Sequence, residues 1–177
     1  GRVFYRGAVE SISEPVRRPK VGPNLDALSR KRVISRAGTT FERDDTYQFL
    51  HMHLRDAAYE ALPLRARADL HERFATWLEK SAGPRGEEYQ EIIAHHLEAA
   101  SQYRLQLGGR LTESEERAAA KAAALLESAG RRALARGDVR GTTGMLQRAL
   151  ELLPDGHASR PTLAAELFTA LLESGDL

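Results

Sequence analysis

The pattern of apolar and polar positions changes period near residue 50. Residues 47–51 alternate aromatic and polar side chains, which predicts a short strand leading into a helix that ends before Pro63. A second amphipathic helix should begin at Leu64, because large apolar side chains then recur at helical spacing: Leu70, Phe74, Trp77 and Leu78. We expect Trp77 to be buried against Phe74 and against the helix that follows Gly86.

Upstream of this stretch, the pattern predicts two helices and two strands. An apolar face over residues 3–12 predicts a first helix with no capping residue before it. Residues 15–23 are typical of a turn-rich linker, and Asn24 is a plausible N-cap for a short helix with Leu25 and Leu28 inward. Residues 32–36 alternate as a strand and residues 37–40 form a turn. This order predicts a winged helix whose first helix lies partly or wholly upstream of Gly1.

Downstream of Trp77 the pattern is helical throughout. After a loop at residues 81–86, one buried stripe is expected on the next helix, formed by Tyr89, Ile92, Ile93, His96, Leu97 and Ala100. Gly108 and Gly109 should end that helix. Thr112 and Glu115 fit a capping box that opens a long, alanine-rich helix.

A helical repeat is visible near the C-terminus. Its spacing resembles that of tetratricopeptide repeats, with small residues at Ala129, Gly130, Ala133 and Ala149, a turn at Gly137 and Asp138, and a closing Pro154. Thr142 stands where that repeat favours alanine, so looser packing is expected there. The turn recurs at Gly175 and Asp176, 38 residues later, and residues 155–158 should hold the extra length over a period of about 34.

Together these elements predict a mainly α fold: a partial winged helix with a small β-wing, followed by a helical-hairpin, tetratricopeptide-like superhelix. We divide the chain into a truncated winged-helix module at residues 1–62, a connecting helical pair at 63–111, and repeats at 112–177, one full and one half. A half repeat should expose its inner face, which includes Leu163, Leu167, Phe168 and Leu171.

Composition adds limits to this picture. The 177 residues are 42% apolar and 29% charged, as in ordinary soluble domains. With no cysteine there is no disulfide or thiolate metal site, which fits a reducing cytoplasm. No apolar run approaches the roughly 20 residues that span a bilayer. We therefore expect a soluble, cytoplasmic chain without membrane contact, and a net charge of +1 gives no global attraction to nucleic acid.

Local charge does not favour nucleic-acid binding either. Residues 30–32 form a basic helix end, but the preceding helix carries Asp26 and apolar side chains where base readout needs Asn, Gln or Arg. We interpret the basic residues as a solvated helix end that suits the helix dipole, and expect no direct nucleic-acid contact.

No spacing of residues supports catalysis. The chain has no phosphate-binding loop, no His-Glu-x-x-His motif and no glycine-flanked serine. His51 and His53 would share a strand face if the strand reached that far, and His95 and His96 are adjacent on a helix, but neither pair predicts converging metal ligands. We expect no metal site. His71 and His96 should instead be partly buried and hydrogen-bonded across a helix interface, and His157 should be solvated.

The central stretch also resembles a known family. The residues that carry the resemblance follow the pattern F-x-H-x-x-x-R-D-x-x-Y-x-x-L, then R-x-x-x-H-x-x-x-A-x-x-L: Phe49, His51, Arg55, Asp56, Tyr59, Leu62, Arg67, His71, Ala75 and Leu78. This pattern is similar to the segment that follows the ATPase core in bacterial STAND-type signalling ATPases. Such segments occur in LuxR-type transcription regulators and in ATPases fused to adenylate or guanylate cyclase domains.

The resemblance implies a role for His51. In plant and animal STAND receptors, a winged-helix histidine in a methionine–histidine–aspartate motif reaches the diphosphate of bound ADP and holds the closed state. Here Leu50 and Met52 replace the methionine and aspartate, and His53 replaces the aliphatic residue of related bacterial sequences. The alternative interpretation of His51 is a structural histidine at a strand end.

The expected function is therefore regulatory and non-catalytic. The winged helix would relay the nucleotide state of an upstream nucleotide-binding core of the same protein, which binds ATP or ADP, and the repeats would receive a protein or small-molecule inducer. The chain itself should need no cofactor, since it lacks a phosphate loop. A different hypothesis is a free-standing helical-repeat scaffold that binds a peptide or protein partner.

Overall fold

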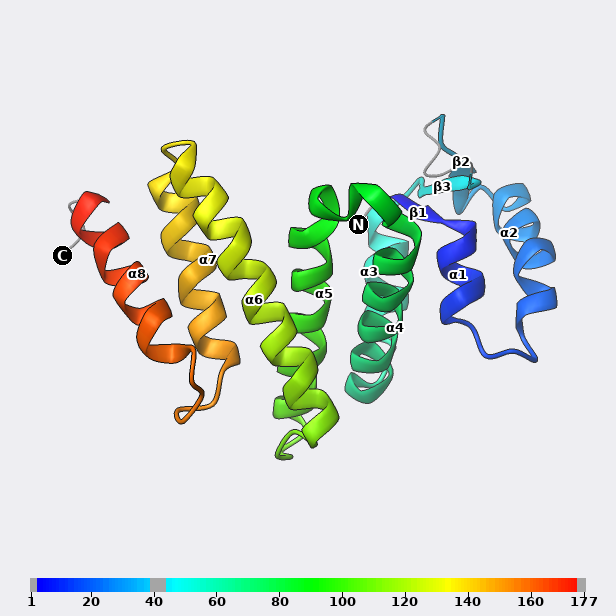
Figure 1. The fold of residues 1–177 in the computed structure, drawn as a ribbon. Coiled ribbons are helices and arrows are strands. Elements are labelled where there is room, and N and C mark those ends of the chain that lie inside the picture. Colours follow the sequence, from blue (N-terminus) through cyan, green and yellow to red (C-terminus); the bar gives the residue numbers. More distant parts are fainter. Residues whose placement is uncertain (1–2, 39–43, 175–177) are drawn as a thin grey trace.

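The computed structural model describes residues 3–38 and 44–174, which form a small sheet-containing unit followed by a row of helices (Figure 1). The sheet unit comprises β1 (Val3–Tyr5), α1 (Arg6–Ile12), a 3-10 turn (Arg18–Lys20), α2 (Val21–Arg30), β2 (Ile34–Arg36) and β3 (Thr46–Phe49). After it come α3 (Met52–Glu60), α4 (Leu64–Ala82), a second 3-10 turn (Gly83–Arg85), α5 (Gly86–Gln106), α6 (Glu113–Ala135), α7 (Val139–Leu152) and α8 (Arg160–Ser174). The expectation of a mainly helical chain with a small sheet is confirmed.

The sheet is antiparallel, with the strand order β1-β3-β2. Phe4 lies opposite Tyr47, and Ser35 lies opposite Gln48. One face packs on α2 and buries a small core, which consists of Val21, Leu25, Ile34 and Tyr47. The rings of Phe4 and Tyr47 stack at 5.8 Å between centroids, so the edge strand β1 is held by an aromatic pair as well as by its hydrogen bonds.

The N-terminal segment differs from the prediction. The apolar face over residues 3–12 was expected to be one helix, but Val3–Tyr5 pairs with β3 as a strand and the helix begins at Arg6. Its first turn is capped from a distance in sequence, because the Asp44 carboxylate accepts the Gly7 N–H at 2.6 Å and the Asp45 carbonyl accepts the Arg6 N–H at 2.9 Å. Asp44 and Asp45 are distant in sequence from α1, so the sequence next to the helix did not predict a cap.

The second helix also begins earlier than expected. It starts at Val21, so Asn24 is a first-turn residue and not the N-cap. Pro23 is tolerated there because the first-turn amides have no partner within a helix. Leu25 is buried as expected, whereas Leu28 is 38% exposed. The turn expected at residues 37–40 lies partly outside the described residues. At its described end, the Ala37 N–H donates to the Thr46 carbonyl at 2.8 Å.

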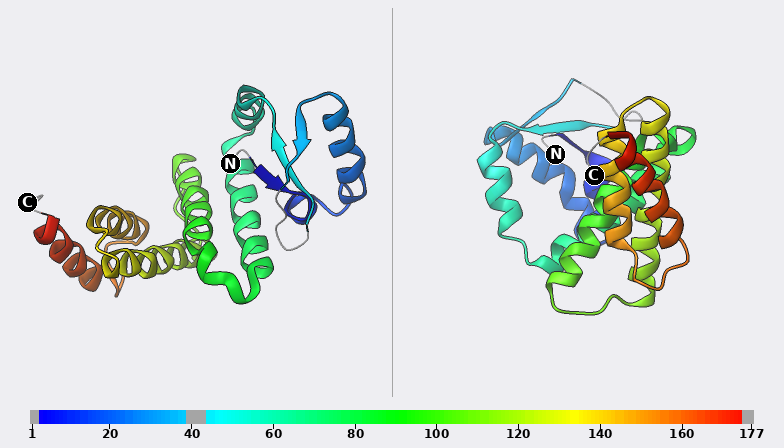
Figure 2. Two further views of the ribbon diagram at one scale, coloured as in Figure 1. Left: turned by 90° about the horizontal axis from the view of Figure 1, so that it is seen from above. Right: turned by 90° about the vertical axis from the view of Figure 1, so that its left-hand side faces the viewer.

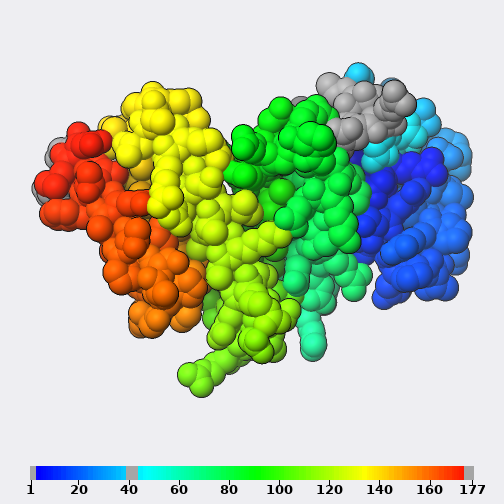
Figure 3. Space-filling model, viewed as in Figure 1, coloured from blue at the N-terminus to red at the C-terminus, as the bar shows by residue number. Residues whose placement is uncertain are grey.

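Helices α4 to α8 form the helical row, in which consecutive helices pack on each other, and α4 also packs on α1 of the sheet unit. Figure 2 shows from above that the sheet unit and α8 lie at opposite ends of the molecule, and in Figure 3 the helices of the row follow one another along the surface in sequence order. Small side chains on α6 permit close approach, and Gly130 lies so near α7 that a Cβ there would be 3.5 Å from Leu146 and Met145.

The ends of α6 agree with the sequence analysis. Thr112 and Glu115 make both hydrogen bonds of a capping box. After α6, Gly137 adopts a positive φ of 78° and Asp138 caps α7 by accepting the Gly141 N–H at 2.8 Å. The α6–α7 hairpin turn therefore lies at the predicted glycine and aspartate.

Three packing expectations need correction. Thr142 does not loosen the hairpin: it is 1% exposed, and its hydroxyl lies 3.1 Å from the Gly130 carbonyl oxygen. Ile92 is 44% exposed, so it is not in the buried stripe of α5. Trp77 is only half-buried and stacks on Tyr5 of β1 at 5.8 Å, as well as contacting Phe74 at 5.6 Å. Trp77 thus joins the helical row to the sheet unit.

Of the four apolar residues expected on the exposed face of the half repeat, only Phe168 is exposed, because Leu163 is buried and Leu167 and Leu171 are half-buried. Leu163 is buried against α7, while Phe168 and Leu172 are 54% and 53% exposed. Residues 155–158, where extra length was expected, connect α7 to α8. The recurring turn at Gly175 and Asp176 lies outside the described residues.

Candidate functional site

His51 lies at the point where β3 gives way to α3. Its backbone is extended, at φ −125° and ψ 113°, and it is the N-cap residue of α3, but its side chain makes no capping hydrogen bond. The side chain is exposed. The structure therefore places the predicted nucleotide-sensing histidine at the open end of the central strand, accessible from outside the chain.

The neighbouring motif residues do not gather around His51. The strand ends at Phe49, so His51 and His53 do not share a strand face, and His53 is an exposed residue in the first turn of α3. Arg55 and Asp56 form an ion pair with each other. The strand was expected to extend further because the alternating pattern continues to His51, whereas the helical hydrogen bonds already begin at Met52.

Helix α3 is held to the helical row through Tyr59. No residue of α3 is fully buried. The Tyr59 hydroxyl lies 2.8 Å from His71 Nε2 on α4 and 2.8 Å from the Tyr103 hydroxyl on α5. One side chain thus connects three helices.

Arg67 also stabilises the connection between α3 and α4, here called the α3–α4 corner. Its guanidinium donates to the carbonyl oxygens of Leu62 at 2.9 Å and Glu60 at 2.7 Å, which closes the end of α3. The guanidinium carbon also lies 4.9 Å from the Tyr59 ring centroid and 5.8 Å from that of Tyr103, within cation–π range. The α3–α4 corner is consequently fixed by one arginine between two tyrosines.

The hydrogen-bonded chain continues from His71 to His96. Their Nδ1 atoms are 3.1 Å apart, so one of the two must carry the proton and the other must accept it. His71 and His96 are both half-buried, and His96 also packs on the Phe74 ring at 4.4 Å between centroids. This confirms the prediction of partly buried histidines bonded across a helix interface. His157, expected to be solvated, is half-buried, and its Nδ1 accepts the Ser159 N–H at 3.2 Å.

Burial keeps this chain uncharged. Desolvation is the main cause that lowers the pKa of His71 to about 4 and that of His96 to about 3, and the neighbouring histidines add to both shifts. Desolvation, followed by the hydrogen bond to Tyr103, raises the pKa of Tyr59 to about 12. At neutral pH the imidazoles and the Tyr59 hydroxyl are therefore all neutral.

A neutral chain of this kind has two proton arrangements. In one, Tyr59 donates to His71, His71 donates to His96, and the N–H of His96 is on Nε2. In the other, His96 donates to His71, His71 donates to Tyr59, and Nε2 of His96 is a bare acceptor. Within the described residues no hydrogen bond involves that Nε2, so the end of the chain offers either a donor or an acceptor.

His71, His96 and Tyr59 form part of the wall of a large hollow. This hollow, here called the groove, has a volume of about 870 Å³ and lies between β1, α1, β3, α3, α4 and α5. Most of its wall is apolar or aromatic. The polar side chains that line it are Tyr5, Arg55, Tyr59, His71, Tyr89, His95 and His96. His51 does not line it.

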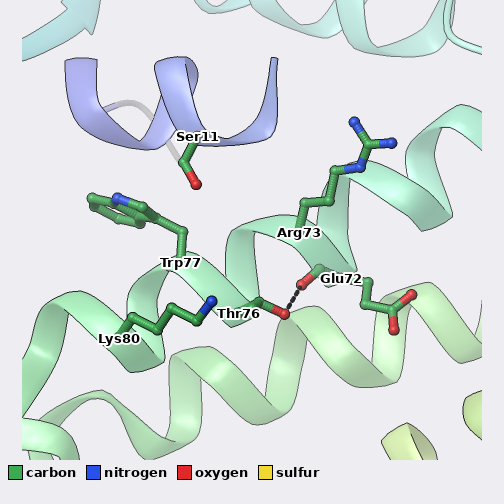
Figure 4. Close-up of a pocket in the computed structure, with 6 residues that line it drawn as sticks. All are labelled: Ser11, Glu72, Arg73, Thr76, Trp77 and Lys80. Atoms are coloured by element: carbon green, nitrogen blue, oxygen red, sulfur yellow. Dashed lines mark hydrogen bonds between the residues drawn. The ribbon is translucent and has the colours of Figure 1, made fainter. Parts of the chain in front are cut away.

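A second, smaller hollow lies between α1 and α4 (Figure 4). Its volume is about 350 Å³, and all of its lining residues except Trp77 are polar or charged. Two of the side chains that line it make contacts between elements: Arg73 donates to the Ile12 carbonyl of α1 at 3.1 Å, and Glu72 pairs with Arg104 of α5. We interpret this hollow as a contact region and not as a binding site.

Two searches of the described residues were negative. Residues 3–38 and 44–174 contain no group of three or more histidine, aspartate or glutamate side chains placed to hold a metal ion. Over the same residues, no helix combines the length and the apolar character that a bilayer crossing requires.

Comparison with known proteins adds no further assignment. No family model matches the chain, and neither a curated protein nor a solved structure shows significant similarity to it. His71 and His96 were expected to be hydrogen-bonded across a helix interface, and His96 was expected in the apolar stripe of its helix. No role was given to Tyr59, Arg67 or Tyr103, and their spacing along the chain, 44 residues between the two tyrosines, contains no signal that they meet.

Proposed function

We propose that this chain is the non-catalytic regulatory segment of a STAND-type signalling ATPase. In this proposal the sheet unit is a truncated winged helix that relays the nucleotide state of an upstream ATP- or ADP-binding core. The helical row is a tetratricopeptide-like arm that receives a protein or small-molecule inducer. The output of the parent protein would be transcription control or cyclase activity in the cytoplasm.

The topology of the sheet unit supports the winged-helix part of the proposal. Two helices lie between β1 and β2, and β2 returns as β3 to the centre of the sheet in the order β1-β3-β2. This arrangement matches that of the elements that follow the first helix in a winged helix. Tetratricopeptide-like packing is supported by the antiparallel α6–α7 hairpin, with its glycine turn and its small residues at the contact.

The observation that carries the proposal is the position of His51. Its imidazole is exposed at the end of the central strand, where a nucleotide held by a neighbouring domain could reach it. A ring nitrogen there can donate to a phosphate oxygen, and such charge-assisted bonds are among the strong ones.

The connections of the sheet unit support transmission from His51 to the arm. His51 begins α3, and the other end of α3 is bound to α4 and α5 through Tyr59 and Arg67. A second connection joins Tyr5 of β1 to Trp77 of α4. A shift of the sheet unit would therefore change the positions of the contacts that α4 and α5 make with it.

The test is His51→Ala in the full-length parent ATPase. Loss of one charge-assisted hydrogen bond should weaken ADP binding by about 1.5–3 kcal/mol, or roughly ten- to a hundredfold in Kd. Because a ligand stabilises the state that it binds better, weaker ADP binding should also increase the signalling output. Calorimetric ADP titration and an output assay are both needed.

His53→Leu is the matched control, since His53 is a second exposed histidine two residues away. It should leave ADP affinity nearly unchanged. If folded His51→Ala protein binds ADP as tightly as the unsubstituted protein, His51 is a structural residue and the nucleotide part of the proposal is wrong. A misfolded variant is recognised separately, because it loses ADP binding and output together.

The scaffold hypothesis has one observation in its favour. The exposed side chains of Phe168 and Leu172 present an apolar surface on α8 that a partner could cover. A scaffold would bind its partner with an affinity that does not depend on ATP or ADP. A nucleotide-dependent partner affinity in the parent protein would therefore exclude it.

A further inference from the structure

The groove has the dimensions and lining of a small-molecule site. Its volume of about 870 Å³ lies within the range of about 300–1,000 Å³ that is usual for ligand pockets. Its wall combines aromatic side chains from β1, β3 and α4, such as Phe4, Phe49 and Phe74, with a few convergent polar groups. This composition matches that of sites that enclose an apolar ligand and orient it by one or two hydrogen bonds.

Charge decides which ligands suit the groove. The guanidinium of Arg55, a cation in its wall, is already paired with Asp56. His71 and His96 are neutral at physiological pH because burial lowers the pKa of each. Neither Arg55, which is paired, nor the neutral His71 and His96 would offer a free positive charge to an anionic ligand. Because burying an unpaired charge is costly, the groove should prefer an uncharged ligand.

The polar end of the groove is defined by the histidines. His96 ends the hydrogen-bonded chain that runs through His71 to Tyr59, and its Nε2 can present a donor or an acceptor. A ligand hydroxyl or carbonyl could therefore be matched without a charge on either side. The proton arrangement would also decide whether the Tyr59 hydroxyl, at the α3–α4 corner, donates to His71 or accepts from it.

We propose that the groove binds an uncharged, largely aromatic small molecule that carries a single hydrogen-bonding group. The ligand contacts β1 and β3 on one side and α4 and α5 on the other, so its binding stabilises the packing of the sheet unit on the helical row. The site is distinct from the nucleotide role proposed for His51, and its test does not involve nucleotide.

Two fluorescent probes with the same ring system test the preference for an uncharged ligand. N-phenyl-1-naphthylamine is neutral, and 8-anilinonaphthalene-1-sulfonate is its sulfonated analogue. The neutral probe should bind the 177-residue chain with saturable fluorescence enhancement, and the sulfonate at least about tenfold more weakly. Equal affinities, or no binding of the neutral probe to the folded chain, would overturn the proposal.

A pair of variants on one helix locates the site. Ile92 lines the groove and is 44% exposed, so Ile92→Lys adds a cation at the wall without opening the core. This substitution should weaken binding of the neutral probe about tenfold or more and strengthen binding of the sulfonate. Leu105→Lys is the control, because Leu105 is also on α5, is 52% exposed and lies outside the groove. Equal effects of the two variants would show that the probe binds elsewhere.

Energy transfer and competition complete the test. Trp77 is the single tryptophan and stacks on Tyr5, which lines the groove, so excitation of Trp77 should sensitise emission from the bound neutral probe. 2-Naphthol should displace the probe at lower concentration than naphthalene, because it adds one hydrogen-bonding group. If an amphipathic peptide of leucine and lysine displaces the probe more readily than 2-naphthol does, the groove takes a helix and the small-molecule proposal is wrong.

Discussion

The carboxylate of Glu98 on α5 accepts two hydrogen bonds from the guanidinium of Arg148 on α7, at 3.0 Å from Nε to Oε1 and 2.5 Å from Nη2 to Oε2. Glu98 is 6% exposed. The pair joins two helices that are not consecutive, in a row where most packing is between neighbours. A buried charge of this kind depends on its partner, because water is largely excluded from it.

Removal of Arg148 alone should therefore be destabilising. We expect Arg148→Ala to lower the free energy of unfolding by about 2–3 kcal/mol, below the range for a fully buried pair, because the Arg148 side chain is 39% exposed. Replacement of both residues, as Glu98→Leu with Arg148→Met, should recover most of this loss, since no unpaired charge remains. Urea denaturation followed by circular dichroism measures both. A double variant as unstable as the single one would contradict this account.

Two glycines of the α6–α7 hairpin should respond oppositely to alanine. At Gly130 a Cβ would make ordinary 3.5 Å contacts with Leu146 and Met145, so Gly130→Ala should stabilise the chain by about 0.5–1 kcal/mol through helix propensity. At Gly141 a Cβ would lie 2.2 Å from a carboxylate oxygen of Asp138, the side chain that caps α7. Gly141→Ala should lose that cap, which is worth about 1 kcal/mol.

The difference between the two glycine variants is the measured quantity. Their unfolding free energies should differ by about 1 kcal/mol or more, with Gly130→Ala the more stable. Asp138→Ala provides the control, because the loss in Gly141→Ala should largely disappear once the capping carboxylate is gone. Equal stabilities of the two variants would show that the Asp138 side chain moves aside at no cost.

The neutral histidines should make stability depend on pH. Below a pH of about 6.5 an unfolded chain protonates His71 and His96, whereas the folded chain resists protonation down to about pH 4 and about pH 3. The unfolded state then binds more protons, so the free energy of unfolding should fall as pH decreases from about 6.5 toward 4. Above about pH 6.5 these two groups contribute no pH dependence.

Substitution of both histidines isolates this effect. The double variant His71→Gln with His96→Gln should show a shallower decline of stability between about pH 6.5 and 5, a range above the titration of ordinary carboxyl groups. Nitrogen chemical shifts of the two imidazoles should also stay those of the neutral form at pH 5. An unchanged pH slope in the double variant, or charged imidazoles at pH 5, would refute the assignment.

Elements that depend on nearby sequence could be predicted, and those that depend on distant partners could not. The capping box of Thr112 and the turn at Gly137 use residues within a few positions of each other, so the sequence contained the whole signal. Val3–Tyr5 was misassigned because an apolar run is consistent with a strand or a helix, and its partner in β3 is more than 40 residues away.

The candidate site divides in the same way. The apolar stripe predicted for α5 included His96, and the structure brings His96 and His71 together across a helix interface as expected. Their continuation to Tyr59 and Tyr103 depends on the packing of α3 against α4 and α5, which no local period encodes. The groove is formed by six separate elements, so no local pattern of the sequence could predict it.

The strand order β1-β3-β2 also has a consequence for the order of folding. Pairing of Val3 with Gln48 closes a long loop before any hydrogen bond between these strands can form, and the entropic cost of closure rises with loop length. Each pair of neighbouring helices in the row, in contrast, meets across a short connection, and structures rich in local contacts fold faster. The part of this chain that leaves the ribosome first is therefore expected to be completed last, after the helices that follow it have already associated.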